Sequence, residues 1–169
     1  MRAFLKASLY LLVCTALLTF IRPVPALAAD VPAKTEKPKL YDTQANGTQQ
    51  IAVAIKTATA ENKRIILKFG ANWCGWCHKL SGLLNTNAAV ARIVKENYVV
   101  VLIDVDKGHN DDAVKRYGNP TQFGLPALVV LDSDGKQLTT QDTGKLEEGD
   151  HHDPAKVIAF LEKWKKPKH

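Results

Sequence analysis

Two of the three cysteines, Cys74 and Cys77, lie close together in the segment FGANWCGWCHKL. A tryptophan precedes each of them, Trp73 and Trp76, and His78 follows the second cysteine directly. The spacing C-x-x-C is typical of thiol–disulfide exchange, whereas C-x-x-C-H is typical of covalent haem attachment. The segment therefore predicts one of two redox chemistries, and the rest of the sequence has to distinguish them.

The first 28 residues have the pattern of a secretory signal peptide. Basic residues at the start are followed by the apolar run ASLYLLVCTALLTFI and by small residues at Ala26 and Ala28. The run is short for a bilayer span, and Arg22 and Pro23 end it, so an uncleaved anchor helix is the weaker alternative. We expect cleavage after Ala28, export to the periplasm or the extracellular space, and membrane contact only through this segment.

Cleavage would also remove Cys14, which leaves Cys74 and Cys77 as the thiols of the mature chain. An isolated pair in an exported protein is either a structural disulfide or a pair that makes and breaks one. A disulfide that closes so small a loop stabilises the folded protein by only roughly 2 kcal/mol. A disulfide that forms and breaks during function therefore explains the spacing better. The lost segment carries three basic residues and no acidic ones, so the formal charge falls from +6 to +3. No motif indicates nucleic-acid binding.

The pattern after the signal peptide predicts one domain, residues 48–169, behind a flexible lead-in, residues 29–47, that is rich in proline and lysine. Thr48 is the expected N-cap of the first helix. Apolar periodicity predicts helices at 48–63, 75–84, 87–97, 110–118 and 155–164, strands at 64–69 and 98–106, and a hairpin at 125–141. This alternation predicts an α/β fold with a central mixed sheet that is flanked by helices on both faces.

The cysteine pair falls where a predicted strand ends and a helix begins, and α/β sheets often build their sites at such a point. Cys74 is expected at the exposed start of the helix and Cys77 one turn further in. A helix N-terminus stabilises an anion by about 0.3–2 kcal/mol, which favours the thiolate of Cys74. We therefore expect Cys74 to be the attacking thiol and Cys77 the resolving thiol.

The segments NWCGWC, after the strand IILKF, and GLPALVVLD, some fifty residues later, resemble the thioredoxin superfamily over residues 48–165. Within it, the chain is most similar to small exported members with a WC-x-x-C site. The resemblance implies a thioredoxin fold and disulfide exchange with protein thiols. It also implies a redox partner that resets the site, and a monomer that needs no cofactor and no metal.

The resemblance also implies roles for the residues around the cysteines. Pro126 corresponds to a cis-proline that lies against the disulfide, and the backbone of Leu125 would pair with an extended substrate strand. Trp73 would shield the first cysteine. Gly75 and Trp76, between the cysteines, would influence the reduction potential, so reductase, oxidase and isomerase activities are not distinguished.

Lys68 departs from the thioredoxin pattern, because thioredoxin has a buried acidic residue six positions before its first cysteine. Lys68 either favours a thiolate electrostatically or points to solvent at the end of its strand. His78 is expected to tune Cys74, to contact a partner, or to lie exposed on the helix. Both are candidate tuning residues.

Haem attachment remains an alternative, since the C-x-x-C-H string and export suit it. A sixth iron ligand could not be methionine, because Met1 is the only one; His109, His151, His152 or His169 would have to serve. The motif also follows a buried strand, whereas small cytochromes are mostly helical. A domain that holds a partner on a thioredoxin surface without turnover is the other alternative.

Overall fold

The computed structural model describes residues 39–167. The expected signal peptide, with Cys14, and residues 29–38 of the expected lead-in lie outside the described residues. Within residues 39–167, no helix is long and apolar enough to cross a membrane.

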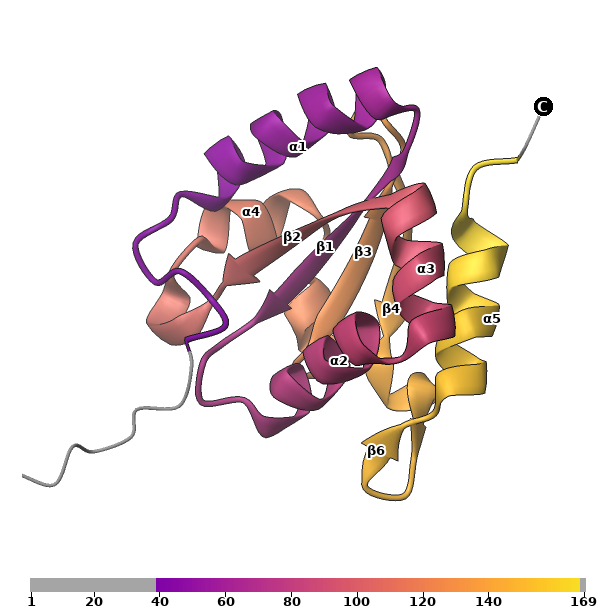
Figure 1. Ribbon diagram of the computed structural model, residues 1–169. Coiled ribbons are helices and arrows are strands. Elements are labelled where there is room, and N and C mark those ends of the chain that lie inside the picture. The colour runs from indigo at the N-terminus through magenta and orange to yellow at the C-terminus, as the bar shows by residue number, and fades with distance from the viewer. Residues whose placement is uncertain (1–38, 168–169) are drawn as a thin grey trace, which may run out of the picture. The chain divides into compact units, whose positions relative to one another are not determined.

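The central sheet is mixed, as the sequence predicts. Its strands run in the spatial order β2-β1-β3-β4 (Figure 1), with the bounds β1 Arg64–Gly70, β2 Tyr98–Asp104, β3 Ala127–Leu131 and β4 Gln137–Asp142. Strands β1 and β2 are parallel, and β3 is antiparallel to both β1 and β4. The predicted α/β architecture is confirmed.

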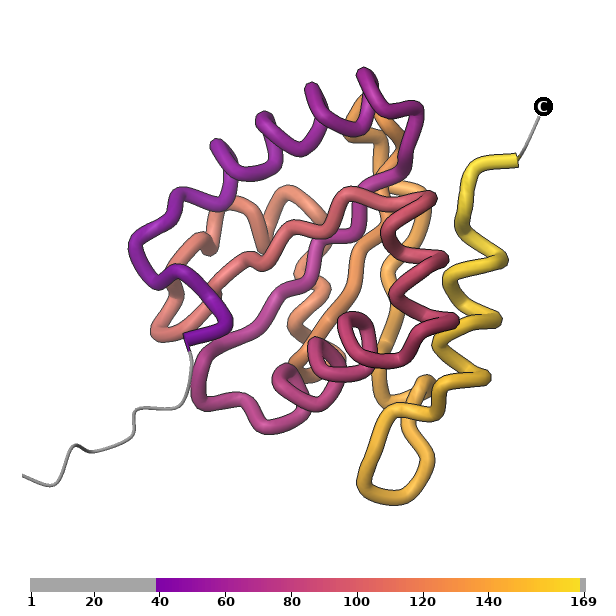
Figure 2. Tube along the Cα trace, in the orientation of Figure 1, coloured from indigo at the N-terminus to yellow at the C-terminus, as the bar shows by residue number. Residues whose placement is uncertain are grey.

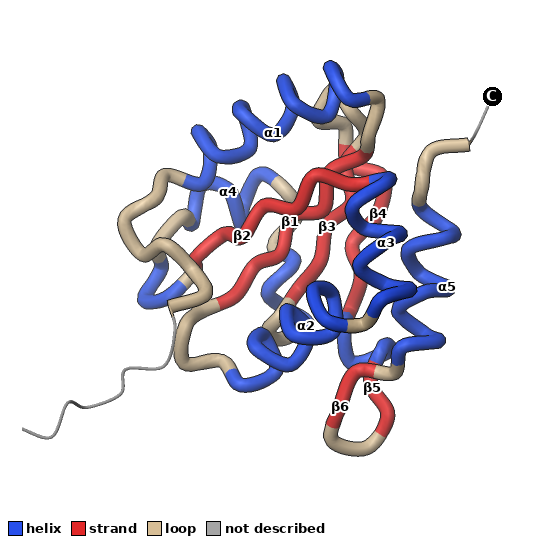
Figure 3. The backbone as a smooth tube through the Cα atoms, in the orientation of Figure 1, coloured by secondary structure: helices blue, strands red, loops and turns tan. Residues whose placement is uncertain are grey.

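Helices cover both faces of the sheet (Figure 3). The helices are α1 (Gly47–Glu61), α2 (Gly75–Thr86), α3 (Ala88–Asn97), α4 (Asp111–Arg116) and α5 (Pro154–Trp164), with short turns η1 (Asp106–Gly108), η2 (Pro120–Phe123) and η3 (Thr143–Leu146) and a small hairpin of β5 (Glu147–Glu148) and β6 (His151–His152). One core joins α1 and α4 to the sheet, and a second joins α2, α3 and α5 to its other face.

Strand β1 divides its side chains between the two cores. Ile65, Leu67 and Phe69 belong to the core under α1, whereas Ile66 belongs to the core under α2. Successive side chains of a strand point to opposite faces, so Lys68 falls on the same face as Ile66, beneath α2. This register buries a lysine in the middle of the domain.

The ordered fold begins earlier than the sequence pattern indicates. Asn46, and not Thr48, caps α1, because its side chain accepts a hydrogen bond from the backbone N–H of Gln49 at 2.9 Å. Tyr41 is only 1 % exposed, so the chain already packs against the domain at this residue. Figure 2 shows this first described segment beside the loop that joins β1 to α2.

Candidate active site

Cys74 and Cys77 form a disulfide at the N-terminus of α2, with their Cα atoms 5.2 Å apart. Cys74 is the N-cap of the helix, and its Sγ accepts a hydrogen bond from the backbone N–H of Cys77 at 3.1 Å. Cys74 is 5 % exposed and Cys77 is 0 % exposed. Both cysteines are thus buried, so the expectation that Cys74 lies exposed at the start of the helix is wrong, although Cys74 keeps slightly more exposed surface than Cys77.

The disulfide packs on a small apolar cluster of its own. Tyr41 is the other fully buried member of this cluster, and half-buried side chains pack around it: Leu40, Trp76, Leu102 and Leu125. Gly70 allows the close approach, because a Cβ there would lie 2.2 Å from the Tyr41 hydroxyl oxygen and 2.7 Å from Cys77 Sγ. The end of β1, the start of α2 and the segment before α1 thus meet at the buried cysteine.

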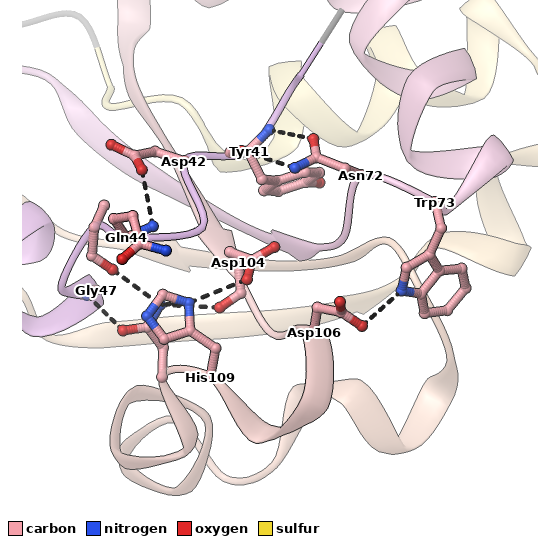
Figure 4. Close-up of polar contacts among 11 residues, drawn as sticks. Tyr41, Asp42, Gln44, Gly47, Asn72, Trp73, Asp104, Asp106 and His109 are labelled. Carbon is pink, nitrogen blue, oxygen red and sulfur yellow. Dashed lines mark hydrogen bonds and ion pairs between the residues drawn. The ribbon is translucent and has the colours of Figure 1, made fainter. Parts of the chain in front are cut away.

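Asn72 ties the segment before α1 to the active-site loop (Figure 4). Its side-chain oxygen accepts from the backbone N–H groups of Leu40 (2.7 Å) and Tyr41 (2.8 Å), and its amide nitrogen donates to the carbonyl of Tyr41 (2.9 Å). His78 Nε2 lies 2.8 Å from the backbone oxygen of Asn72. His78 is thus half-buried and bonded within the loop, and is not a freely exposed helical side chain.

Lys68 is fully buried beneath α2, so the expectation that it points to solvent is wrong. Its Nζ donates to the backbone carbonyl of Cys77 at 2.9 Å and to Ser81 Oγ, and lies 5.0 Å from the centre of the Tyr41 ring. Burial lowers the pKa of Lys68 to about 7. A titratable amine therefore lies directly under Cys77.

The two tryptophans beside the cysteines differ in environment. Trp73 is 70 % exposed, and its indole N–H donates to Asp106 Oδ1 at 2.8 Å (Figure 4). Trp76 is half-buried; the ring of His152 packs edge-on at 5.2 Å and Lys79 Nζ lies 4.4 Å from its centre. Burial lowers the pKa of His152 and so favours its neutral form.

The loop before β3 completes the site. The Leu125–Pro126 peptide bond is cis, as the resemblance implies, and Leu125 packs against the cysteine cluster. The carbonyl of Pro126 accepts a hydrogen bond from the hydroxyl of Thr143. Gly75 is exposed on the first turn of α2, between the cysteines.

The family profile described as thioredoxin-like matches residues 46–133, which span both the cysteine pair and Pro126. The chain belongs to the thioredoxin-like family. A solved structure described as a disulphide isomerase from Xylella fastidiosa has 32 % sequence identity and a TM-score of 0.68, and the match covers 76 % of this chain and 98 % of that one.

Other thioredoxin-like relatives match a smaller share of their own length. The thiol:disulfide interchange protein DsbD of Ralstonia nicotianae is 31 % identical over 97 residues, which are 56 % of this chain and 15 % of the relative. The disulfide bond reductase DsbH of Chlamydia pneumoniae is 27 % identical over 97 residues, 53 % of this chain and 58 % of the relative. This chain thus spans a small part of DsbD and about half of DsbH.

Some residues of this thioredoxin-like site carry no local signal in the sequence. Tyr41 lies before the matched family region, and its contact with Asn72 joins positions 31 residues apart. Ser81 looks like an ordinary helical serine until Lys68 is seen to be buried. His152 stands in the acidic run EEGDHHD, which is typical of solvated loops, yet it is 3 % exposed. These residues are recognised as part of the site only because each is buried against an element that is distant in the sequence.

Proposed function

We propose that the protein is an exported thiol–disulfide oxidoreductase that exchanges disulfides with protein thiols through Cys74 and Cys77. The observation that carries this proposal is the disulfide at the N-terminus of α2, whose first cysteine keeps a small exposed surface while the second has none. The named activities of the DsbD, DsbH and disulphide isomerase relatives support the same class of reaction.

The reaction begins at Cys74. In the reduced protein, the backbone N–H of Cys77 and the helix N-terminus stabilise the Cys74 thiolate. This thiolate attacks one sulfur of a partner's disulfide. A bond forms between Cys74 and that sulfur, the partner's own S–S bond breaks, and the second partner sulfur leaves as a thiolate.

Cys77 then resolves the mixed disulfide. Its thiol loses a proton, and the thiolate attacks Cys74 Sγ, so that the bond from Cys74 to the partner breaks and the Cys74–Cys77 bond forms. The partner leaves as a thiolate and takes up a proton. The protein loses two electrons and the partner gains them; the reverse sequence oxidises a dithiol.

Lys68 supplies the proton acceptor for Cys77 in this scheme. Its amine is held against the Cys77 carbonyl, and with a pKa of about 7 a large share of it is neutral at neutral pH. Thioredoxin, as the resemblance implies, places an acid at this position. A neutral amine does the same work here, and after taking the proton it becomes a cation that favours the thiolate.

In this proposal, residues around the cysteine pair contact the substrate. Trp73 is held by Asp106 beside the cysteines, and the backbone of Leu125, next to the cis-proline Pro126, would pair with an extended partner strand. Gly75 and Trp76 fill the turn between the cysteines and influence the reduction potential. His78 contributes by holding the backbone of Asn72.

Residues 1–28 act in this proposal as the signal peptide, and the mature chain works as a monomer in the periplasm or outside the cell. A second thiol–disulfide protein resets the site. The site geometry favours exchange over haem attachment, because Cys77 is 0 % exposed and bonded to Cys74, and His78 contacts Asn72 instead of an open face. An absorption band of covalent haem in the purified exported protein would contradict the proposal.

Insulin reduction with dithiothreitol tests turnover. The wild-type protein should accelerate precipitation of the insulin B chain, and Cys74→Ser should reduce the rate to that of dithiothreitol alone. Equal rates for the two proteins would favour a binding module without turnover. Equilibration with glutathione then gives the reduction potential, which separates a reductant from an oxidant or isomerase.

A further inference from the structure

The hydroxyl of Tyr41 is buried, and within residues 39–167 it has no hydrogen-bond partner. A buried tyrosine hydroxyl usually has one, because an unpartnered polar group in a protein core costs free energy. Hydrogen bonds to Asn72 hold the main chain of Tyr41, and the hydroxyl is packed closely against Gly70. Its position therefore calls for a partner in another state of the protein.

Cys77 Sγ is a reactive atom close to this hydroxyl. The hydroxyl oxygen lies 2.2 Å, and the sulfur 2.7 Å, from the point where Gly70 would carry a Cβ, so the two atoms are at most 4.9 Å apart. No hydrogen bond joins them in the oxidised protein. In the oxidised protein this sulfur is bonded to Cys74 and is a weak acceptor. Once the S–S bond is broken, a Cys77 thiolate is free to approach the hydroxyl and is a strong, charged acceptor.

The surroundings keep Tyr41 protonated and able to donate. Burial and the charge of Asp104 both raise the pKa of Tyr41 above its ordinary value. Asp104 lies opposite Gly70 in the parallel pairing of β1 and β2. Lys68 Nζ lies over the tyrosine ring, 5.0 Å from its centre, and makes no hydrogen bond to the hydroxyl.

We propose that the Tyr41 hydroxyl donates a hydrogen bond to the Cys77 thiolate that resolves the mixed disulfide, so that the segment before α1 is part of the active site. This rests on the proposed function. The proton stays on the tyrosine oxygen throughout; the thiolate attacks Cys74 Sγ, and the partner sulfur leaves with the electron pair. Tyr41 is thus a positioning residue that stabilises the attacking anion.

The test follows both steps with dithiobis-nitrobenzoate, which releases one coloured thiolate when Cys74 attacks and a second when Cys77 resolves. In Tyr41→Phe, the first, bimolecular phase should be unchanged. A lost bond to the anion should raise the inflection of the second phase by about one pH unit. Since nucleophilicity rises with thiol pKa, the second phase should be about threefold slower near neutral pH and about threefold faster at high pH.

The control is Tyr117→Phe, which removes another buried, unpartnered hydroxyl from the core under α1. It should leave both phases as in the wild type, and thermal unfolding of the oxidised variants reports any loss of folding. A second phase whose pH profile is the same in Tyr41→Phe and wild type overturns this inference alone. Absence of the first phase in the wild type overturns the proposed function and this inference with it.

Discussion

The amine of Lys68 donates a hydrogen bond to the backbone carbonyl of Cys77, 2.9 Å away, from the interior of the sheet. Burial lowers the pKa of Lys68 to about 7 from an ordinary value of 10.5. The buried ammonium of Lys68 lowers the stability of the folded protein, whereas in the proposed mechanism the neutral amine accepts the proton of Cys77. These two effects depend on pH in different ways.

Lys68→Met should stabilise the oxidised protein most at low pH. Below pH 7 the folded protein holds a buried ammonium, which destabilises it. Between pH 7 and 10.5 Lys68 is protonated in the unfolded chain but neutral in the folded one. The stability of the wild type therefore rises with pH over this range. The stability difference between Lys68→Met and wild type should therefore shrink by on the order of 3 kcal/mol between pH 5.5 and 9.5. Denaturant unfolding at several pH values measures it.

Lys56→Met is the control for the unfolding measurements, because Lys56 is an exposed lysine on α1. Lys56→Met removes a solvated charge, so its stability difference from the wild type should stay small. A difference that varies with pH equally in the two variants would contradict the burial argument for Lys68.

Lys68→Met should also slow the resolving step. The neutral amine increases as pH rises through about 7, so the wild-type rate of resolution should rise between pH 6 and 8. Without the amine, resolution at pH 7 should fall by about tenfold or more, while attack by Cys74 continues. Stopped-flow measurement of the two thiolate releases separates the steps. Unchanged resolution at pH 7 would mean that the proton of Cys77 goes directly to water.

Asn72→Ala should release the segment that carries Tyr41. The substitution removes three hydrogen bonds to Leu40 and Tyr41, so the free energy of unfolding should fall by about 1–3 kcal/mol. Amide hydrogen exchange at Leu40 and Tyr41 should quicken before the rest of the domain is affected. In Asn97→Ala, which removes one local bond to the Ile93 carbonyl, exchange at these amides should not change.

Gly70→Ala should destabilise the site through crowding. The added Cβ would lie 2.2 Å from the Tyr41 hydroxyl and 2.7 Å from Cys77 Sγ, so we expect a loss of about 1–3 kcal/mol. Tyr41→Phe in the same chain should recover part of it, since one clashing atom is gone. Gly82→Ala meets no neighbour within 4 Å and should instead stabilise α2 by about 0.5–1 kcal/mol. Thermal unfolding of the set measures these differences, and purely additive losses would argue against the contact.

The fold could be predicted because its signals are local. Ile65, Leu67 and Phe69 repeat at the strand period, Asn87 and Asp153 cap the helices they precede, and Cys74 and Cys77 have their spacing within one helical turn. Caps and periods depend on a few neighbouring residues, so a sequence displays them directly.

The buried residues around the cysteine pair could not be predicted from local sequence signals. A lysine at the end of a strand reads as solvated, and only the packing of α2 over β1 shows that Lys68 is buried. Tyr41 reads as part of a polar lead-in until Asn72, 31 residues later, binds its backbone. These contacts join distant segments, so they exist only once the fold has formed.

The proposed roles of Cys74 as attacking thiol and Cys77 as resolving thiol are tested most directly by trapping the mixed disulfide. Reduced Cys77→Ala and Cys74→Ala are each mixed with a disulfide-bonded peptide, quenched with acid and analysed by mass spectrometry without reductant. A one-to-one adduct should accumulate on Cys74 in Cys77→Ala, and no adduct should form in Cys74→Ala on the same timescale. An adduct that forms on Cys77 as fast as on Cys74 would contradict these roles.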